Sequence, residues 1–345
     1  MRFRFAFALL FLSQCLLIGT PATALAENSR GIGLQPVEKK LAVATSKGSY
    51  RALIIGNNNY KDQHGLWKPL KTAVSDARAV KTLLENSYGF SDVNVLENAT
   101  RRDVLQAFES LSQKVLPDDH VLVYYAGHGF METETNRGFW VPVDAKGKDN
   151  TTFLRNSTIR DELTTIASRA KHTLLISDSC FSGSLLRRGT RGISNASNSE
   201  QYYKKVANKK SVQIMAAGGV EYVDDNYRSS DHSPFTYFLL NELKNNDRPM
   251  LTLSELSTNV EKAVANNVDQ VPESGVLQGA GDELGEFIFI KMDLVVNGVP
   301  ADKVKVQVNV KQGDGSQTRK LMIEADQPAM NNQNRRKEIL PVPTL

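Results

Sequence analysis

Two stretches of the chain each join an apolar strand to a polar, glycine-bearing end: His120-Val-Leu-Val-Tyr-Tyr-Ala-Gly-His-Gly129 and Thr173-Leu-Leu-Ile-Ser-Asp-Ser-Cys-Phe-Ser-Gly183. A short apolar run bounded by such residues is typical of a buried strand. Ligands of open parallel sheets bind outside the carboxyl ends of the strands. We therefore expect both polar ends to lie at one edge of a sheet and to form a site there.

Strands and helices alternate along the rest of the chain from Tyr50. Further strands are expected at 52–55, 93–96, 212–217 and 286–290, and helices at 70–86, between Thr100 and Pro117, at 158–169, from Ser233 and from Leu253 to Asn266. Strands separated by helices imply right-handed crossovers. The pattern predicts an α/β fold with a mainly parallel, six-stranded sheet and helices on both faces.

The composition is that of a globular protein. The 345 residues suffice for one large domain or two ordinary ones, and 41% hydrophobic with 23% charged residues excludes collagen-like, coiled-coil and wholly disordered chains. The net charge of +4 includes no long run of like charges, so no nucleic-acid-binding arm is expected. With two cysteines, a disulfide framework and a CxxC zinc site are excluded.

The N-terminus has the pattern of a secretory signal. Arg2 and Arg4 precede an apolar run over 5–19 and an Ala-x-Ala ending at Ala26. The apolar run is shorter than the roughly 20 residues that an uncleaved membrane anchor needs. We expect cleavage after Ala26, no later membrane-spanning segment, and a bacterial protein exported to the periplasm or secreted.

Removal of the signal leaves Cys180 as the one cysteine of the mature chain. An unpaired cysteine in an exported protein is either a buried small hydrophobe or a reactive thiol. If the strands before His128 and Cys180 are neighbours, their ends lie about 4.8 Å apart, and the imidazole can generate the nucleophilic thiolate. The flanking glycines would let a substrate backbone approach.

The two blocks resemble the catalytic blocks of caspase-like cysteine peptidases, in particular the metacaspase and bacterial orthocaspase branch. The separation of 52 positions between histidine and cysteine agrees with the caspase spacing of about 50. Supporting blocks lie at 52–56, 75–77, 141–144, 212–217 and 233–236, so the resemblance covers roughly residues 50–290. It implies the three-layer α/β/α sandwich of the caspases.

The resemblance also implies roles for single residues and no required cofactor. Cys180 would attack the scissile carbonyl, and His128 would protonate the leaving amine. The backbone N–H groups of Gly129 and Cys180 would form the oxyanion hole. The family uses a dyad, and no third catalytic residue is evident in the sequence.

Two acidic residues on motif positions suggest the specificity. Asp178 precedes the cysteine by two residues, and Asp76 matches the family's acid on the first helix. Two carboxylates in one pocket would require a cationic partner, so we expect protein or peptide substrates with Arg or Lys before the cut bond. Alternatively, Asp76 is an ordinary first-turn acid and Asp178 caps a loop.

The segment 187–210 holds seven basic residues and one acid. It is expected to be an exposed linker, either a solvated loop or a site of self-cleavage after Arg188, Arg191, Lys205 or Lys210. The resulting division is a signal peptide at 1–26, a lead-in or pro-region at 27–48, a large-subunit-like catalytic part at 49–186, the linker at 187–210, a small-subunit-like part at 211–291, and an extension at 292–345 with a possible hairpin and a disordered tail.

Calcium binding, known in metacaspases, is disfavoured. Asp144 and Asp161 match part of the family's acidic cluster, but Arg160 and Arg187 stand where acids are expected. The remaining histidines show no zinc-ligand spacing.

Two other functions remain open. A catalytically silent caspase-like scaffold would usually lack the histidine or the cysteine, which this chain keeps. A legumain-like or gingipain-like peptidase of other specificity fits the Asp-Ser-Cys-Phe-Ser-Gly block less well. Either a monomer or a homodimer agrees with the sequence.

Overall fold

The computed structural model describes residues 48–62, 65–179, 185–187, 200–218, 227–228, 230–277, 279–292, 295–296, 299–300, 304–309 and 320–325. The expected signal peptide, nearly all of the lead-in and the C-terminal tail lie outside these residues.

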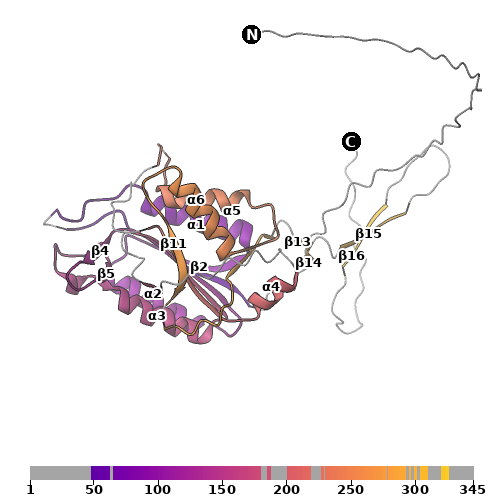
Figure 1. The fold of residues 1–345 in the computed structure, drawn as a ribbon, viewed down its shortest axis with the longest axis horizontal. Helices are drawn as coiled ribbons and strands as arrows, with labels where there is room; N and C mark the ends of the chain where they lie inside the picture. Colours follow the sequence, from indigo (N-terminus) through magenta and orange to yellow (C-terminus); the bar gives the residue numbers. More distant parts are fainter. Residues whose placement is uncertain are drawn as a thin grey trace, which may run out of the picture. The chain divides into compact units, whose positions relative to one another are not determined.

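A mostly parallel sheet forms the centre of the molecule (Figure 1). Its strand order is β2-β1-β3-β7-β9-β11-β8. The bounds are β1 Tyr50–Gly56, β2 Phe90–Glu97, β3 His120–Ala126, β7 His172–Asp178, β8 Leu186–Arg187, β9 Ser211–Ala216 and β11 Glu273–Leu277. In this order, the strands from β2 through β1, β3 and β7 to β9 pair in parallel. β11 is antiparallel to both of its neighbours. The predicted caspase-like α/β fold is confirmed.

Five helices cover the two faces of this sheet (Figure 1). One face packs against α1 (Ala73–Tyr88), α5 (Pro234–Asn245) and α6 (Leu253–Ala265). The other packs against α2 (Arg101–Lys114) and α3 (Asn156–Arg169). The three layers follow from strands that are apolar on both sides, as parallel strands buried between helices must be.

Neighbouring side chains along each strand contribute alternately to the two cores. Ile54 and Tyr124 belong to the core under α1, α5 and α6, whereas their chain neighbours Ile55 and Tyr125 belong to the core under α2 and α3. Successive strand side chains point to opposite faces, so one strand supplies both layers.

The predicted helix starts are confirmed. Thr100 begins α2 with a reciprocal capping box to Asp103. Ser233 caps α5 by accepting from the backbone N–H of Thr236, and Pro234 follows at the first helical position.

One predicted strand lies in a different sheet. The segment 286–290 forms β12 (Ile288–Ile290), which pairs with β10 (Met250–Thr252) in a separate two-stranded sheet. The sixth position of the central sheet belongs to β11, whose first two residues are exposed and whose last residue, Leu277, is buried. A strand with one buried residue has no apolar run, so hydrophobic pattern does not reveal it.

Part of the basic segment 187–210 is folded, in contrast to the exposed linker that we expected. Residues Glu200–Ala207 form α4, and Tyr203 is 3% exposed within a small cluster that contains Met250 and Ile288. Tyr202, Val206 and Ala207 pack against the same cluster, so one side of α4 is held against the folded body.

Smaller elements complete the described structure. A three-stranded sheet of β4 (Gly129–Glu132), β5 (Arg137–Trp140) and β6 (Leu154–Arg155) lies between β3 and α3 in the chain, with a 3-10 turn at Asn150–Thr152. In the C-terminal extension, β13 (Val295–Val296) pairs with β14 (Val299–Pro300), and β15 (Val304–Asn309) pairs with β16 (Lys320–Ala325).

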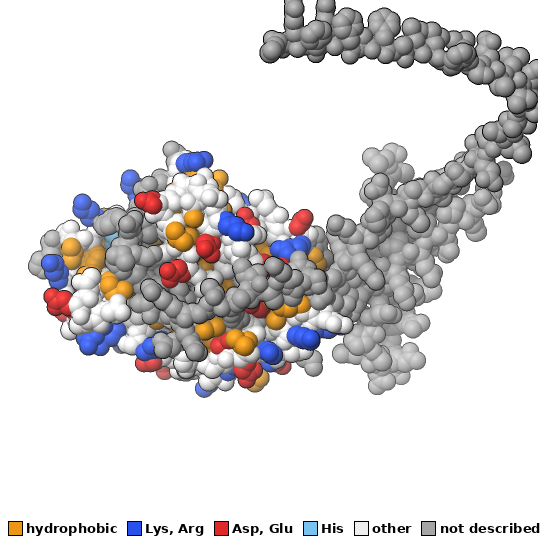
Figure 2. Space-filling view, viewed as in Figure 1, with side chains coloured by type: hydrophobic (Ala, Val, Ile, Leu, Met, Phe, Trp, Pro, Cys, Tyr) orange, Lys and Arg blue, Asp and Glu red, His pale blue; other side chains and the backbone are white. Residues whose placement is uncertain are grey.

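Among the described residues, no helix is both long and apolar enough to cross a membrane. Figure 2 shows basic and acidic side chains interspersed over the visible face of the folded body, in line with the small net charge.

Candidate active site

The register of β3 and β7 aligns the two polar strand ends. The strands are parallel neighbours, and their last pair is Ala126 with Asp178. His128 and Cys180 therefore each follow this pair by two positions. The N–H of Gly127 donates to the carbonyl of Asp178 at 3.3 Å, which joins the two chains just beyond the sheet. Cys180 itself lies outside the described residues.

The backbone of His128 is held from both sides. Its N–H donates to the hydroxyl of Tyr60 at 2.7 Å, and its carbonyl accepts from the hydroxyl of Tyr125 at 2.8 Å. The ring packs against Tyr60 and Trp67, with centroids 4.6 and 5.7 Å apart. These contacts restrict the imidazole at the end of β3.

A backbone carbonyl sets the tautomer of His128. Its Nε2 lies 2.8 Å from the carbonyl oxygen of Lys68. A carbonyl can only accept, so Nε2 carries the proton and Nδ1 is the basic nitrogen of the neutral ring. The sequence suggested no third member beside the dyad. The structure supplies an orienting group, the backbone carbonyl of Lys68, which cannot be recognised from residue types.

Gly127 allows this close packing. A Cβ added there would stand 2.8 Å from the hydroxyl oxygens of both Tyr60 and Tyr125. Any larger residue would push apart the two hydroxyls that hold His128. Gly129 opens β4 opposite Trp140 and is half-buried; its oxyanion role, with that of Cys180, remains a prediction.

The two predicted pocket acids belong to one hydrogen-bonded network. Asp76 comes from the first turn of α1, and Asp178 ends β7. The N–H of Ser233 donates to Asp76 Oδ2 at 3.2 Å, and its hydroxyl donates to Asp178 Oδ2. A residue at the start of α5 thus connects both carboxylates.

The start of α5 supplies further donors. The hydroxyl of Thr236 donates to Asp178 Oδ2 at 2.7 Å, and Tyr124 lies 2.6 Å from the same hydroxyl. The positive end of the α5 dipole faces the carboxylates and favours their charged forms. Burial raises the pKa of Tyr124, and the nearby carboxylates raise it further.

A histidine that we did not predict completes the network. Nδ1 of His232 lies 2.7 Å from Asp76 Oδ1. Burial raises the pKa of Asp76, while the hydrogen bonds from His232 and Ser233 oppose that shift. In the sequence, the block at 233–236 carries only the family resemblance, and no pattern singles out His232.

The two described candidate cleavage sites, Lys205 and Lys210, lie in different backbone environments. Lys205 is exposed but lies within α4. The N–H of Lys210 donates to the carboxylate of Glu283, and its carbonyl accepts from the N–H groups of Glu283 and Gly285. Arg188 and Arg191 lie outside the described residues.

The acids that match the family's calcium cluster lie on two separate segments, and the expected lack of calcium dependence stays a prediction. The carboxylate of Asp144 accepts from the backbone N–H of Arg101 at 2.9 Å, and Arg160 occupies a half-buried position on α3 beside Asp161. Within the described ranges, no three His, Cys, Asp or Glu side chains are grouped to hold a metal ion.

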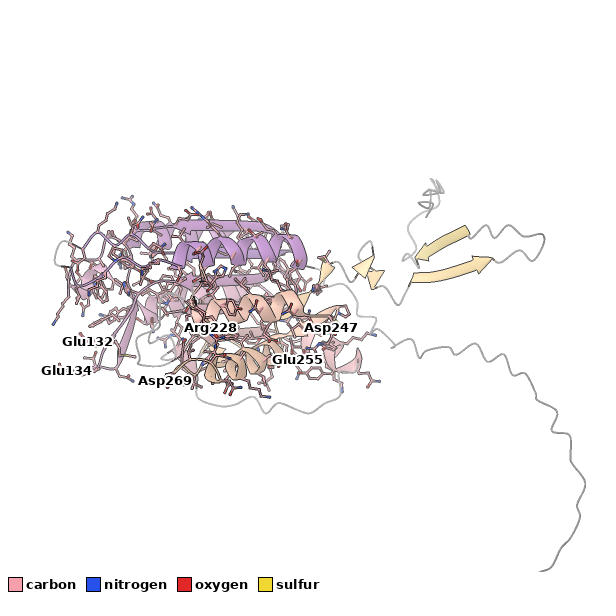
Figure 3. All side chains as sticks on the ribbon, turned by 90° about the horizontal axis from the view of Figure 1, so that it is seen from above. Glu132, Glu134, Arg228, Asp247, Glu255 and Asp269 are labelled. Carbon is pink, nitrogen blue, oxygen red and sulfur yellow. The ribbon has the colours of Figure 1, made fainter. Side chains whose placement is uncertain are left out.

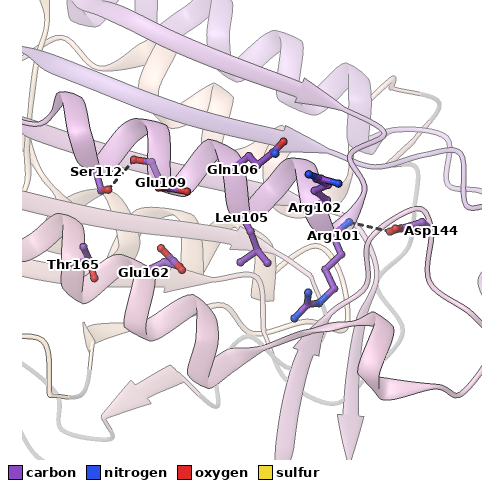
Figure 4. A pocket seen from close by; sticks show the side chains of 9 residues that line it. All are labelled: Arg101, Arg102, Leu105, Gln106, Glu109, Ser112, Asp144, Glu162 and Thr165. Atoms are coloured by element: carbon purple, nitrogen blue, oxygen red, sulfur yellow. Dashed lines mark hydrogen bonds between the residues drawn. The ribbon is translucent and has the colours of Figure 1, made fainter.

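A groove of about 730 Å³ lies between α2 and α3. Figure 4 shows Arg101, Arg102 and Asp144 at one end of it and Glu109 and Glu162 towards the other. None of the predicted catalytic or specificity residues lines this groove.

The fold and this site define an α/β protein with a histidine and a second polar strand end at the carboxyl edge of a parallel sheet. A model of the caspase domain (peptidase family C14) matches residues 49–276, so the chain belongs to the caspase family. The expected likeness to caspase-like peptidases of the metacaspase type is confirmed.

Individual relatives are distant. Metacaspase-1 of Eremothecium gossypii is 29% identical over 174 residues, which cover 45% of this chain and 36% of that protein. A solved structure from Geobacter sulfurreducens is 20% identical, with a TM-score of 0.43 over 69% of this chain and 99% of that one. Caspase-1 from Spodoptera frugiperda is 17% identical, with a TM-score of 0.47 over 68% of this chain and 88% of that one.

Proposed function

We propose that this protein is a cysteine endopeptidase that uses Cys180 and His128 to cleave peptide bonds after Arg or Lys. The observation that carries the proposal is the β3–β7 register, in which both residues follow the same strand pair by two positions. Membership of the caspase family supports the same chemistry.

The protonation state of His128 suggests the direction of each proton transfer. Nδ1 takes the thiol proton, and the resulting thiolate attacks the scissile carbonyl. The N–H groups of Gly129 and Cys180 would stabilise the oxyanion. The imidazolium then returns its proton to the leaving amine, and water hydrolyses the thioester. Throughout, the proton stays on Nε2 and is donated to the carbonyl of Lys68, 2.8 Å away, which keeps the ring in place.

The specificity rests on the carboxylate network. Asp76 and Asp178 lie within one set of hydrogen bonds around Ser233. Two buried carboxylates beside the strand ends create a negative potential that favours a cationic substrate side chain. An Asp-specific peptidase would need basic residues there instead.

Hydrolysis of fluorogenic peptides by the purified protein tests the proposal. Peptides with Arg, Lys, Asp or Asn before the scissile bond are compared with and without calcium. Cleavage after Arg and Lys is expected, with loss of activity in Cys180→Ala and of the basic preference in Asp178→Asn. Turnover of none of these peptides by a folded, processed protein would instead favour the scaffold function, and cleavage after Asn a legumain-like one.

We also propose self-processing after Arg188 or Arg191. Proteolysis favours backbone that is exposed and free of hydrogen bonds, and the backbones of Lys205 and Lys210 are engaged in α4 and with Glu283. The variant Arg188→Gln/Arg191→Gln should stay intact, whereas Lys205→Gln/Lys210→Gln should still be cut. Fragmentation of pure Cys180→Ala would contradict self-processing.

Export is proposed from the N-terminal pattern alone. Expressed in a bacterium, the full chain should be found in the periplasm or medium and start at Glu27, whereas a variant without residues 2–26 should remain in the cytoplasm. Recovery of the full chain with its N-terminus intact would contradict this proposal.

A further inference from the structure

The buried position of Asp76 raises a question about how it recognises a substrate. Asp76 is 0% exposed, and each of its carboxylate oxygens accepts a hydrogen bond, one from His232 and one from Ser233. A substrate side chain that arrives from solvent cannot reach either oxygen in this arrangement. The side chain of His232 is 25% exposed, so the imidazole forms the solvent-facing half of the pair.

The hydrogen bond to Asp76 also sets the tautomer of His232. A carboxylate accepts, so Nδ1 of His232 carries a proton. In the neutral ring, Nε2 then presents a lone pair, and the carboxylate behind the ring makes this nitrogen a better acceptor. Guanidinium and ammonium groups have donors only, so they complement such a nitrogen.

We propose that His232 is a specificity-determining residue whose neutral Nε2 accepts a hydrogen bond from the Arg or Lys side chain before the cut bond. Asp76 supplies the negative charge and the tautomer from behind. This inference rests on the proposed Arg/Lys specificity and assigns the direct contact to a different residue.

The surroundings hold the ring in place. The carbonyl of His232 accepts from the N–H of Tyr227 at 2.9 Å, and its N–H donates to the hydroxyl of Ser230 at 3.3 Å. The carbonyl of Asp231 accepts from the hydroxyl of Ser75 at 2.6 Å, which fastens the loop to α1. His232 is therefore presented from a fixed backbone.

Among the described residues, Asp76 on α1 contacts His232 directly, and Asp178 on β7 is linked to it through Ser233, with the hydroxyl of Tyr124 on β3 beyond. The described part of its own loop adds the charged side chains of Asp231 and Arg228. The Arg228 guanidinium, labelled in Figure 3, lies 3.3 Å from Asn267 and over the Tyr227 ring.

Protonation of His232 would remove its acceptor. Nε2 would become a donor, and the added positive charge would repel a cationic substrate. Cleavage after Arg should therefore fall in acid, whereas cleavage after citrulline, the uncharged counterpart of Arg, should not show this component.

Two substitutions separate the acceptor from the rest of the ring. In His232→Asn, the amide nitrogen can donate to Asp76 while the amide oxygen remains an acceptor that does not titrate. His232→Leu has neither. Asp231→Asn, which changes a charge on the same loop without touching Asp76, is the matched control. Thermal unfolding checks that each variant folds.

The readout is kcat/KM for Arg, Lys and citrulline peptides from about pH 5.5 to 8. Because hydrogen bonds to charged groups are the stronger ones, we expect His232→Leu to lower kcat/KM for Arg and Lys by ~10-fold or more, mainly through KM. His232→Asn should keep most of the activity and lose the acidic fall, and Asp231→Asn should keep the wild-type profile. If folded His232→Leu retains both the preference and the profile while wild type cleaves after Arg, the role of His232 is overturned and the proposed function stands.

Binding without turnover distinguishes the remaining outcomes. In the full-length Cys180→Ala protein, agmatine should shift the NMR resonances of the His232 ring at pH 7.5 and much less at pH 5. If wild type cleaves no Arg or Lys peptide and agmatine still shifts this ring, the peptidase proposal fails and cation recognition by His232 is supported. If agmatine shifts nothing, the inference about His232 is overturned as well.

Discussion

Two buried histidines at the amino ends of β3 and β7 predict a steep loss of stability in acid. His120 is 3% and His172 1% exposed, and their rings stack with centroids 4.9 Å apart. Tyr50 stacks on the other side of His120 at 4.3 Å. Burial lowers the pKa of His120 to about 3 and that of His172 to about 4.

The sign follows from where the protons bind. An unfolded histidine titrates near pH 6.5, so between about pH 6.5 and 4 the unfolded chain binds protons that the folded chain excludes. Stability therefore falls as pH falls, with a slope that approaches about 1.4 kcal/mol per pH unit for each histidine well below pH 6.5. Because the unfolded histidines are half protonated at about pH 6.5 and the full slope is reached only below it, the pair removes about 4 kcal/mol from pH 6.5 to 4.5, a large part of the ~5–15 kcal/mol that holds a typical domain together.

The substitution His120→Phe isolates this contribution. Phenylalanine keeps the stacking, and Nδ1 of His120 has no hydrogen-bond partner among the described atoms, so no bond from that nitrogen is lost. Urea unfolding from pH 7.5 to 4.5 should show near-equal stability at the top of the range. At about pH 5 the variant should lose about 1.4 kcal/mol less per pH unit than wild type.

Parallel stability curves for wild type and His120→Phe would refute the reasoning, because the carboxylates that also titrate in this range are common to both. His232→Asn serves as the control, since His232 is partly exposed. The two histidine effects can thus be separated: one acts on the fold, the other on cleavage after basic residues.

Three further substitutions test how the site is held. Gly127→Ala places a Cβ 2.8 Å from the Tyr60 hydroxyl, and overpacking of about 1–3 kcal/mol should displace His128 and cut peptide hydrolysis in a protein whose circular dichroism is unchanged. Tyr60→Phe leaves the His128 N–H unpaired; kcat should fall more than KM rises, and an unchanged kcat would contradict a positioning role. Ser233→Ala removes the α5 cap and a hydrogen bond to the carboxylate of Asp178, so we expect a loss of about 2 kcal/mol in chemical unfolding; an unchanged free energy of unfolding would contradict a stabilising role of this network.

The central part of the fold could be predicted because its signals are local. Strands buried on both faces, such as β1 and β3, are continuous apolar runs, and Thr100 and Ser233 mark helix starts by side-chain chemistry. β11 escaped prediction for the opposite reason. Its position depends on pairing with β9, and Glu273–Leu277 has neither an apolar run nor clear alternation.

The site likewise has one part that the sequence predicts and another that only the folded chain shows. The parallel pairing of β3 and β7 supplies the condition on which the predicted meeting of the two polar strand ends depended. The Lys68 carbonyl could not be predicted, because every residue has a backbone carbonyl. Only the folded chain determines which of them lies beside His128. His232 lies 156 residues from Asp76 and in no recognised block, so only the folded loop brings the two together.

A motif carboxylate identifies the charge of a pocket but not the group that meets the substrate. Asp76 is fully buried, and its charge reaches the solvent side through an imidazole that can lose its acceptor by gaining a proton. A carboxylate exposed to the substrate would offer its charge directly, whereas the same carboxylate behind a histidine would confer a preference that is lost when the imidazole is protonated. In this arrangement, selectivity for a basic side chain and sensitivity to acid would be consequences of the same hydrogen bond.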